Sequence, residues 1–292
     1  MTRSVISNRV LVPLMVLLLT AGFAGAQDDL PIFSADHDFE IVLIHDLGSR
    51  ASVWDETTPF LMGTFDVHTF ELTGHGTTQP VRSTSIDLEA RRLDAFLDEQ
   101  DIEYPTLVGH GLGGMIALRY TLDHPARIHR LVLVDSAPRQ LATDEQKQET
   151  LKQLATNYGP TVAERFLNMS PNPDITDMLV DTALRTDSAS YINLLKSTFD
   201  YDVTDELPGM SVPLFIVGSE MMFPSGENSQ AILHGVGFGK ARSLSFKHIA
   251  MSGHFIMIER PVYLASVLLA FGVTEDHNFD PSQVPPEDGH DH

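Results

Sequence analysis

The chain of 292 residues contains no cysteine, so disulfide bonds cannot stabilise it. Basic residues are also scarce, because 19 lysines and arginines stand against 40 aspartates and glutamates, which gives a formal net charge of -21. Proteins that bind nucleic acid neutralise phosphates with lysine and arginine, and anionic lipid surfaces attract the same side chains. The composition therefore argues against nucleic acid as a partner.

Apolar runs long enough to span a membrane are missing as well. A helix that spans a bilayer needs about 20 apolar residues. The longest candidate, Val10–Thr20, is shorter and is broken by a proline. It follows Arg3 and Arg9 and precedes the small residues Ala24-Gly25-Ala26, an order that is typical of a cleaved export signal. We predict that residues 1–26 are a signal peptide, that the mature chain is exported to the periplasm or the medium, and that it has no stable membrane insertion.

Short apolar runs rich in branched side chains do occur, and such runs suit strands that are buried on both faces. They cover residues 41–45, 66–72, 106–108, 131–134 and 213–217. Segments with helical spacing of apolar residues, such as 86–97 and 113–122, separate several of them. Alternating strands and helices predict an α/β fold with a mostly parallel central sheet flanked by helices.

This alternation stops after Asp135 and resumes at Pro213. The intervening sequence is polar and has helical character, which predicts a helical cap inserted into the α/β core. The predicted division is a core of residues 27–138 and 209–273, a cap of residues 139–208, and an acidic, proline-containing tail of residues 274–292 that we expect to be disordered.

Glycine and histidine recur in four loops that we expect each to follow a strand and to lie together at the carboxyl edge of the sheet, where open α/β folds bind their ligands. The loops are His45-Asp46-Leu47-Gly48, Gly74-His75-Gly76, Gly109-His110-Gly111-Leu112-Gly113-Gly114 and Gly253-His254-Phe255. In this order, and with the later Glu259-Arg260-Pro261, they resemble the α/β-hydrolase family. The resemblance covers roughly Glu40 to Gly272 and implies the fold, the cap and the site of that family.

A missing side chain sets the third loop apart from the family pattern. The family presents a serine, or an aspartate in dehalogenase and epoxide-hydrolase relatives, at the centre of Gly-x-Ser-x-Gly, on a sharp turn between strand and helix. Gly109 and Gly113 are kept here, but the central residue is Gly111. No covalent intermediate can form at a residue without a side chain. We therefore predict that the chain does not work as an ordinary serine hydrolase.

The remaining catalytic positions of the family are only partly kept. The resemblance places His254 at the position of the catalytic histidine, which would be the base in an active enzyme. The acid usually follows the strand after the cap in a Gly-x-x-Asp pattern, where this chain has Met221. Two alternatives remain for the acid, namely Glu220, one residue away, and Asp135, at the end of the strand before the cap.

Backbone N–H groups form the oxyanion hole in this family, here that of Leu112 and one from the loop 45–48. Asp46 replaces the usual glycine of that loop, and a carboxylate there would oppose the negative charge that develops in the reaction. The predicted binding residues are Leu47, Gly48, His110, Leu112 and Phe255. We expect a small apolar or ester-like ligand, no cofactor and no metal ion.

Three functions are compatible with these residues. The leading interpretation is an exported, degenerate hydrolase relative that retains a small-molecule pocket and has lost triad chemistry. The alternative is a hydrolase of ester-like substrates that uses a water activated by His254. A second alternative is dinucleotide binding, because Gly109, Gly111 and Gly114 match the G-x-G-x-x-G fingerprint and Asp135 follows about 20 residues later. That fingerprint, however, normally belongs to the first strand of its domain, and here it follows the third.

Overall fold

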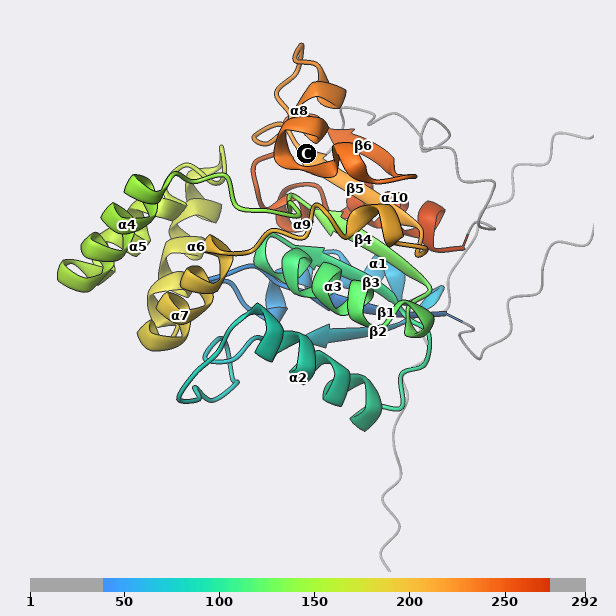
Figure 1. Ribbon diagram of the computed structural model, residues 1–292, viewed down its shortest axis with the longest axis horizontal. Helices are drawn as coiled ribbons and strands as arrows, with labels where there is room; N and C mark the ends of the chain where they lie inside the picture. The colour runs from blue at the N-terminus through green and yellow to red at the C-terminus, as the bar shows by residue number, and fades with distance from the viewer. Residues whose placement is uncertain (1–38, 274–292) are drawn as a thin grey trace, which may run out of the picture. The chain divides into compact units, whose positions relative to one another are not determined.

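The computed structural model describes residues 39–273 (Figure 1). All of them belong to one compact unit, Asp36–His292. The predicted signal peptide, residues 1–26, and the predicted acidic tail, residues 274–292, lie outside the described residues. Between residues 39 and 273, no helix combines the length and the apolar character that crossing a membrane requires.

Within the described residues, a single sheet of six parallel strands crosses the molecule in the order β2-β1-β3-β4-β5-β6. The strands are β1 Phe39–Ile44, β2 Phe65–Phe70, β3 Thr106–His110, β4 Arg130–Val134, β5 Leu214–Ser219 and β6 Ser245–Ile249. Every residue of β3, β4 and β5 is buried, as expected for strands covered on both faces. The predicted α/β fold with a mostly parallel central sheet is confirmed.

Helices connect these strands and cover the sheet (Figure 1). The α-helices are α1 Thr58–Leu61, α2 Ile86–Glu99, α3 Leu112–Asp123, α4 Asp144–Thr156, α5 Tyr158–Phe166, α6 Pro173–Arg185, α7 Ser188–Phe199, α8 Ser229–Val236, α9 Ile256–Glu259 and α10 Pro261–Val273. Short 3₁₀ helices span Ala51–Trp54, Pro125–Arg127, Leu207–Gly209 and Phe238–Lys240. Helix α2 packs against α3, and α10 packs against α1 and α9. The apolar residues of α2 form one buried stripe, which explains its helical spacing.

Four helices, α4 to α7, lie between β4 and β5 in the chain and gather at one side of the sheet (Figure 1). Local sequence explains their ends. Thr143 and Gln146 form a capping box at the start of α4, and Pro173 begins α6 directly after its cap, Asn172. This segment falls within the residues 139–208 for which a cap is predicted.

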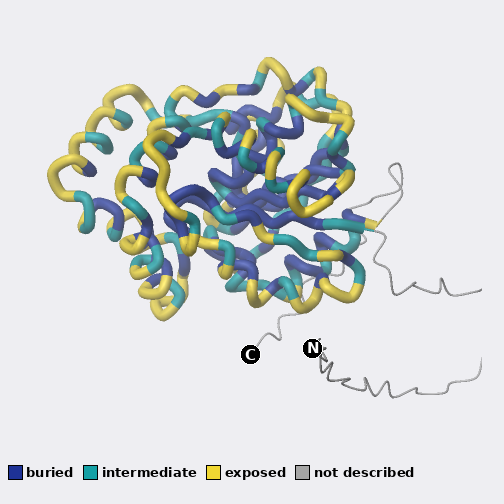
Figure 2. The backbone as a smooth tube through the Cα atoms, turned by 90° about the horizontal axis from the view of Figure 1, so that it is seen from below, coloured by how far each residue is buried: buried dark blue, intermediate teal, exposed yellow. Residues whose placement is uncertain are grey.

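The core runs through the centre of the molecule, where the buried strands lie (Figure 2). Trp54 belongs to this core and is completely buried. The loop after β1 is also fixed from within, because the N–H of Gly48 donates to Nε2 of His75 over 3.0 Å while Nδ1 of His75 pairs with the carbonyl of Thr73 at 2.9 Å. Burial, together with the neighbouring His45, lowers the pKa of His75 to about 3, so the ring is neutral. The anchored loop gives Asp46 a defined position.

Candidate functional site

Gly111 forms the turn between β3 and α3 and has φ 51° and ψ -116°. L-amino acids with side chains rarely adopt this conformation, and it is the kind of sharp strand-to-helix turn that presents a nucleophile in hydrolases. The turn is therefore kept although the side chain is absent. A Cβ atom added at Gly111 would lie 2.2 Å from Cγ of Asp46. The space in front of the turn is thus already occupied by a carboxylate.

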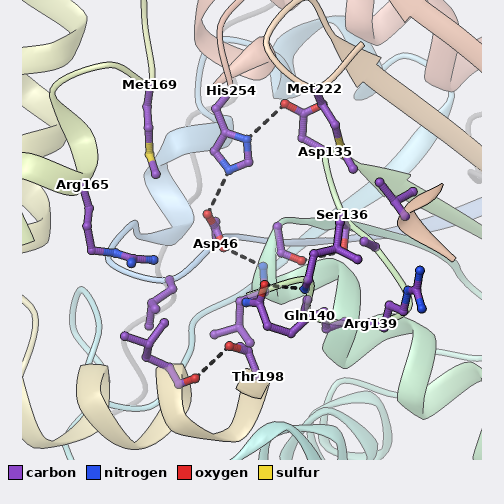
Figure 3. Close-up of a pocket in the computed structure, with 18 of the residues that line it drawn as sticks. Asp46, Asp135, Ser136, Arg139, Gln140, Arg165, Met169, Thr198, Met222 and His254 are labelled. Atoms are coloured by element: carbon purple, nitrogen blue, oxygen red, sulfur yellow. Dashed lines mark hydrogen bonds and ion pairs between the residues drawn. The ribbon is translucent and has the colours of Figure 1, made fainter. Parts of the chain in front are cut away.

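Asp46 reaches this space from the loop after β1, and both of its carboxylate oxygens have partners. Oδ1 accepts a hydrogen bond of 2.6 Å from the N–H of Leu112, the first residue of α3. Oδ2 lies 3.1 Å from Nε2 of His254 (Figure 3). The sequence predicts the Leu112 N–H as a donor of the oxyanion hole. In the structure that donor is bound to Asp46.

On its other side, His254 contacts Asp135, whose Oδ2 lies 3.1 Å from Nδ1 of the ring (Figure 3). Ser219, at the end of β5, holds Asp135 in place. Its N–H donates to Oδ1 over 2.7 Å and its hydroxyl donates to Oδ2 over 2.5 Å. The side chains of Asp135 and His254 are 1% and 16% exposed, respectively. One imidazole therefore lies between two carboxylates in a largely buried site.

The two carboxylates and the imidazole change one another's pKa values. Burial alone would lower the pKa of His254, but its hydrogen bonds to Asp135 and Asp46 outweigh burial and raise the pKa to about 10. Burial would likewise raise the pKa of Asp46, yet the hydrogen bond to His254, the nearby histidine rings and the N–H of Leu112 hold it well below its usual range. At neutral pH, His254 is consequently an imidazolium that donates to Asp46, and it has no free lone pair with which to accept a proton from water.

Of the two acids that the sequence leaves open, the structure brings Asp135 to His254 and leaves Glu220 elsewhere. The carboxylate of Glu220 accepts a hydrogen bond of 2.6 Å from the N–H of Ser225 and lies 3.2 Å from Nε2 of His248. Met221, at the position where the family has its aspartate, is 53% exposed. The chain turns outward after β5, so neither side chain points toward the imidazole.

A cavity of about 290 Å³ opens beside these groups (Figure 3). Asp46, Gly111, Asp135 and His254 all belong to its wall. The segment between β4 and β5 supplies the opposite wall, with the residues Arg165, Phe166, Met169, Tyr191, Leu195 and Thr198. Most of these side chains are apolar. The cavity therefore suits a small, mostly apolar molecule that reaches the two carboxylates and the imidazolium between them.

The predicted binding residues divide into two groups. Leu47 and Leu112 line the cavity. Gly48, His110 and Phe255 lie behind its wall. The N–H of Gly48 donates to His75, and Phe255 is completely buried. The His110 ring is also completely buried, and its centroid lies 4.3 Å from the centroid of the His254 ring. These three residues do not line the cavity and support the site from behind. The motifs gave their places on the loops but not the direction of their side chains, so the sequence could not separate them from the residues that line the cavity.

Two groups of residues in the described part of the chain place metal-binding atom types within 4.8 Å of one another. The groups are Asp46, His110 and His254 in the site, and Glu40, Asp66 and His68 near the start of β1 and β2. In the first group, Asp46 and His254 already neutralise each other as an ion pair, and the second group is partly exposed. Neither geometry by itself indicates a bound ion.

The geometry at the start of α3 argues against dinucleotide binding. A pyrophosphate would need the N–H groups of the helix N-terminus, and Asp46 already occupies that of Leu112. Cβ atoms at Gly109 and Gly114 would come within 2.4 Å of the Gly113 carbonyl oxygen and 2.5 Å of Ser136 Cβ. These glycines allow close packing of protein against protein, and they do not leave room for a phosphate.

Comparisons with known proteins agree with this fold. A model described as the alpha/beta hydrolase family matches residues 41–267. One similar curated protein is pimeloyl-[acyl-carrier protein] methyl ester esterase from Klebsiella pneumoniae (strain 342), which is 35% identical over 137 residues, covering 44% of this chain and 51% of that protein. The chain thus spans about half the length of that esterase in the match.

Other similar proteins differ in their named roles. Karrikin insensitive 2 receptor B from Petunia hybrida is 26% identical over 200 residues, covering 62% of this chain and 72% of the receptor. Among solved structures, the enol-lactonase from Burkholderia xenovorans LB400 superimposes with a TM-score of 0.70 at 19% identity, covering 80% of this chain and 90% of the lactonase. The last similarity establishes the fold alone.

Proposed function

Because the chain belongs to the α/β-hydrolase family, we propose that it keeps the ligand cavity of that family but does not carry out acyl transfer of the serine type. The observation that carries this proposal is the position of Asp46. Its carboxylate fills the space in front of Gly111 and takes the N–H of Leu112. Loss of the nucleophile costs on the order of a million-fold in rate, and loss of one oxyanion donor costs a further factor on the order of a hundred or more.

Hydrolysis of esters by a water that His254 activates is less compatible with the site at neutral pH. A general base must accept a proton, whereas the two flanking carboxylates raise the pKa of His254 to about 10. The oxyanion that such a reaction forms would also meet the carboxylate of Asp46 in place of a free N–H. Activity by this route would therefore be expected only at strongly alkaline pH.

Both turnover and binding occur among the similar proteins, since one is named an esterase and another a receptor. The cavity of about 290 Å³ supports a small ligand, and its largely apolar wall supports one with few polar groups. Export follows only from the signal-like residues 1–26, and we propose on that basis that the mature protein acts outside the cytoplasm.

Four proteins test the loss of serine chemistry, namely the unmodified chain, Gly111→Ser, Asp46→Gly and the double variant. Each would be checked for folding by circular dichroism and assayed with activated aryl esters at neutral pH. We expect turnover only in the double variant. Gly111→Ser alone puts its Cβ 2.2 Å from Asp46 Cγ, and Asp46→Gly alone has no hydroxyl nucleophile. A fifth protein, His254→Ala, tests the water mechanism. Turnover by the unmodified chain that this substitution abolishes would contradict the proposal and favour that mechanism.

A further inference from the structure

A second group of metal-binding side chains lies away from the cavity, on two neighbouring strands at one edge of the sheet. Glu40 belongs to β1, and Asp66 and His68 belong to the edge strand β2 (Figure 1). One ligand-type atom of each side chain lies within 4.8 Å of those of the other two. We propose that these three side chains bind a divalent transition-metal ion of the zinc type, which ties the edge strand to its neighbour.

Strand pairing places the three side chains on one face of the sheet. Glu40 and Asp66 are partners in the parallel ladder between β1 and β2, and His68 follows Asp66 by two residues. Residues two apart in a strand point to the same face, and so do partners on neighbouring parallel strands. The backbone of two paired strands therefore fixes the spacing of the ligands before any ion binds.

The ring of His68 gives the strongest indication of a ligand. Its Nε2 is shielded from solvent and has no hydrogen-bond partner within residues 39–273. Oδ2 of Asp66 lies 3.8 Å from this nitrogen, which is too far for a hydrogen bond. Shielded polar atoms without a partner are uncommon, because each one loses its contact with water and gains nothing in return. A metal ion between His68 and Asp66 supplies the missing partner.

The separation of these two atoms also suits a zinc ion. Zinc lies about 2.0 to 2.2 Å from nitrogen and oxygen ligands, so two ligands of a tetrahedral ion are about 3.4 Å apart. The 3.8 Å between Nε2 of His68 and Oδ2 of Asp66 is close to this value. The Asp66 side chain is 63% exposed, so water can reach the ion and complete its coordination.

Charge and ligand type favour the same class of ion. Asp101 adds a third negative charge near Glu40 and Asp66, and among the ion pairs of residues 39–273 none joins a lysine or arginine to these two carboxylates. Oε2 of Glu40 accepts a hydrogen bond of 2.8 Å from the N–H of Glu103, and such contacts orient carboxylates that bind metals. An imidazole ligand suits zinc and the other late transition metals, whereas calcium and magnesium prefer oxygen ligands.

Isothermal titration calorimetry of the full chain, freed of metal with a chelator, tests the site with Zn²⁺ at neutral pH. Histidines elsewhere in the chain can also bind zinc, so each variant is compared with the unmodified protein. We expect His68→Gln and Asp66→Asn to lose one site or to weaken it at least tenfold. His248→Gln is the matched control and should keep every site, because His248 pairs with Glu220 at 3.2 Å and belongs to no three-ligand group of the described residues. Ca²⁺ should not bind in place of Zn²⁺.

Thermal unfolding separates a built site from histidines that bind zinc loosely. An ion raises Tm only if it binds the folded chain more tightly than the unfolded chain. Zn²⁺ at a hundredfold excess over its Kd should raise Tm by roughly 5 to 10 °C in the unmodified chain and in His248→Gln. The rise should be absent in His68→Gln and in Asp66→Asn, whose exposed side chain can be replaced without disturbing the core.

An unchanged Tm of the unmodified chain in Zn²⁺ would overturn the proposal, as would an equal rise in Asp66→Asn or unchanged binding in both site variants. These measurements involve no residue of the cavity. Their failure would therefore leave the loss of serine chemistry to be judged by the ester assay alone.

Discussion

Replacing Gly111 with alanine adds one methyl group, and the structure places that group 2.2 Å from Cγ of Asp46. Carbon atoms in ordinary contact lie about 3.5 to 4 Å apart, so the carboxylate must move by roughly 1 Å or more. Such a shift breaks the hydrogen bond to Leu112 and weakens that to His254. We expect a loss of about 2 to 3 kcal/mol from these charge-assisted bonds, and about 1 to 2 kcal/mol more because alanine is strained at a φ of 51°.

Asp46→Gly removes the carboxylate, so the steric clash and the loss of its hydrogen bonds no longer contribute to the cost of Gly111→Ala. Gly111→Ala in that background should then lower the free energy of unfolding by only about 1 to 2 kcal/mol, the share that comes from backbone strain. The double-mutant cycle would give a coupling energy of about 2 to 3 kcal/mol between residues that lie far apart in sequence. Independent, distant sites add within about 0.5 kcal/mol, so the predicted coupling is well resolved.

Urea unfolding followed by tryptophan fluorescence suits this measurement, because the chain has a single tryptophan and Trp54 is completely buried. All four proteins of the cycle would be compared at one pH and one temperature. Additive effects of the two substitutions would refute the argument that Asp46 occupies the space in front of Gly111. A conservative control is Asp46→Asn, which keeps the volume of the side chain and should leave the cost of Gly111→Ala high.

Three further predictions concern the site. The folded pKa of His254 is raised to about 10, and its side chain is only 16% exposed, so its stabilising contribution is complete below the unfolded pKa of about 6.5 and is lost as pH rises toward 10. The free energy of unfolding, measured by urea unfolding at several pH values, should therefore fall between these two pH values. The fall should be smaller in Asp46→Asn, which lacks one of the two charges that stabilise the imidazolium. A fall of the same size in both proteins would show that the ion pair with Asp46 does not stabilise the fold. Asp135→Asn should lower the pKa of His254 in a proton NMR titration, because it removes one of the two carboxylates that contact the ring. Glu220→Gln should leave this pKa unchanged, since the Glu220 carboxylate contacts Ser225 instead. A shifted pKa in Glu220→Gln would contradict the assignment of Asp135 as the partner of His254. Met169→Trp should fill part of the cavity and weaken binding of an apolar fluorescent probe severalfold, and unchanged affinity would place the ligand elsewhere.

Local sequence was enough to predict the fold class. The apolar runs correspond to strands β1 to β5. Strands β3, β4 and β5 are buried along their whole length, and strands covered on both faces must be apolar throughout. Strand β2, at one edge of the sheet, is buried only at its two ends. Strand β6, Ser245–Ile249, was not predicted. It lies at the edge of the sheet opposite β2, four of its five residues are only half-buried, and its sequence is correspondingly mixed. Patterns of hydrophobicity report burial, and an edge strand provides less of it.

The sequence also identified His254 as a kept position of the family motifs, and Gly111 and Asp46 as changed positions, because each is recognisable from its neighbours in the chain. It left the choice between Asp135 and Glu220 open, since both follow strands that end at the same edge of the sheet. The structure places Asp135 against His254 through its contacts with Ser219, 84 residues away in sequence. Only the packing of β4 beside β5 decides that geometry.

The relation of Asp46 to the rest of the site was decided by tertiary structure alone. From the sequence, its carboxylate was expected to oppose an oxyanion, and nothing local indicated that it would fill the space in front of Gly111. Its partners Leu112 and His254 are separated from it by 66 and 208 residues. Motifs specify which residues stand on which loops, but hydrogen bonds depend on the direction and distance of side chains, which are fixed only when the loops of β1, β3 and β6 meet at one edge of the sheet.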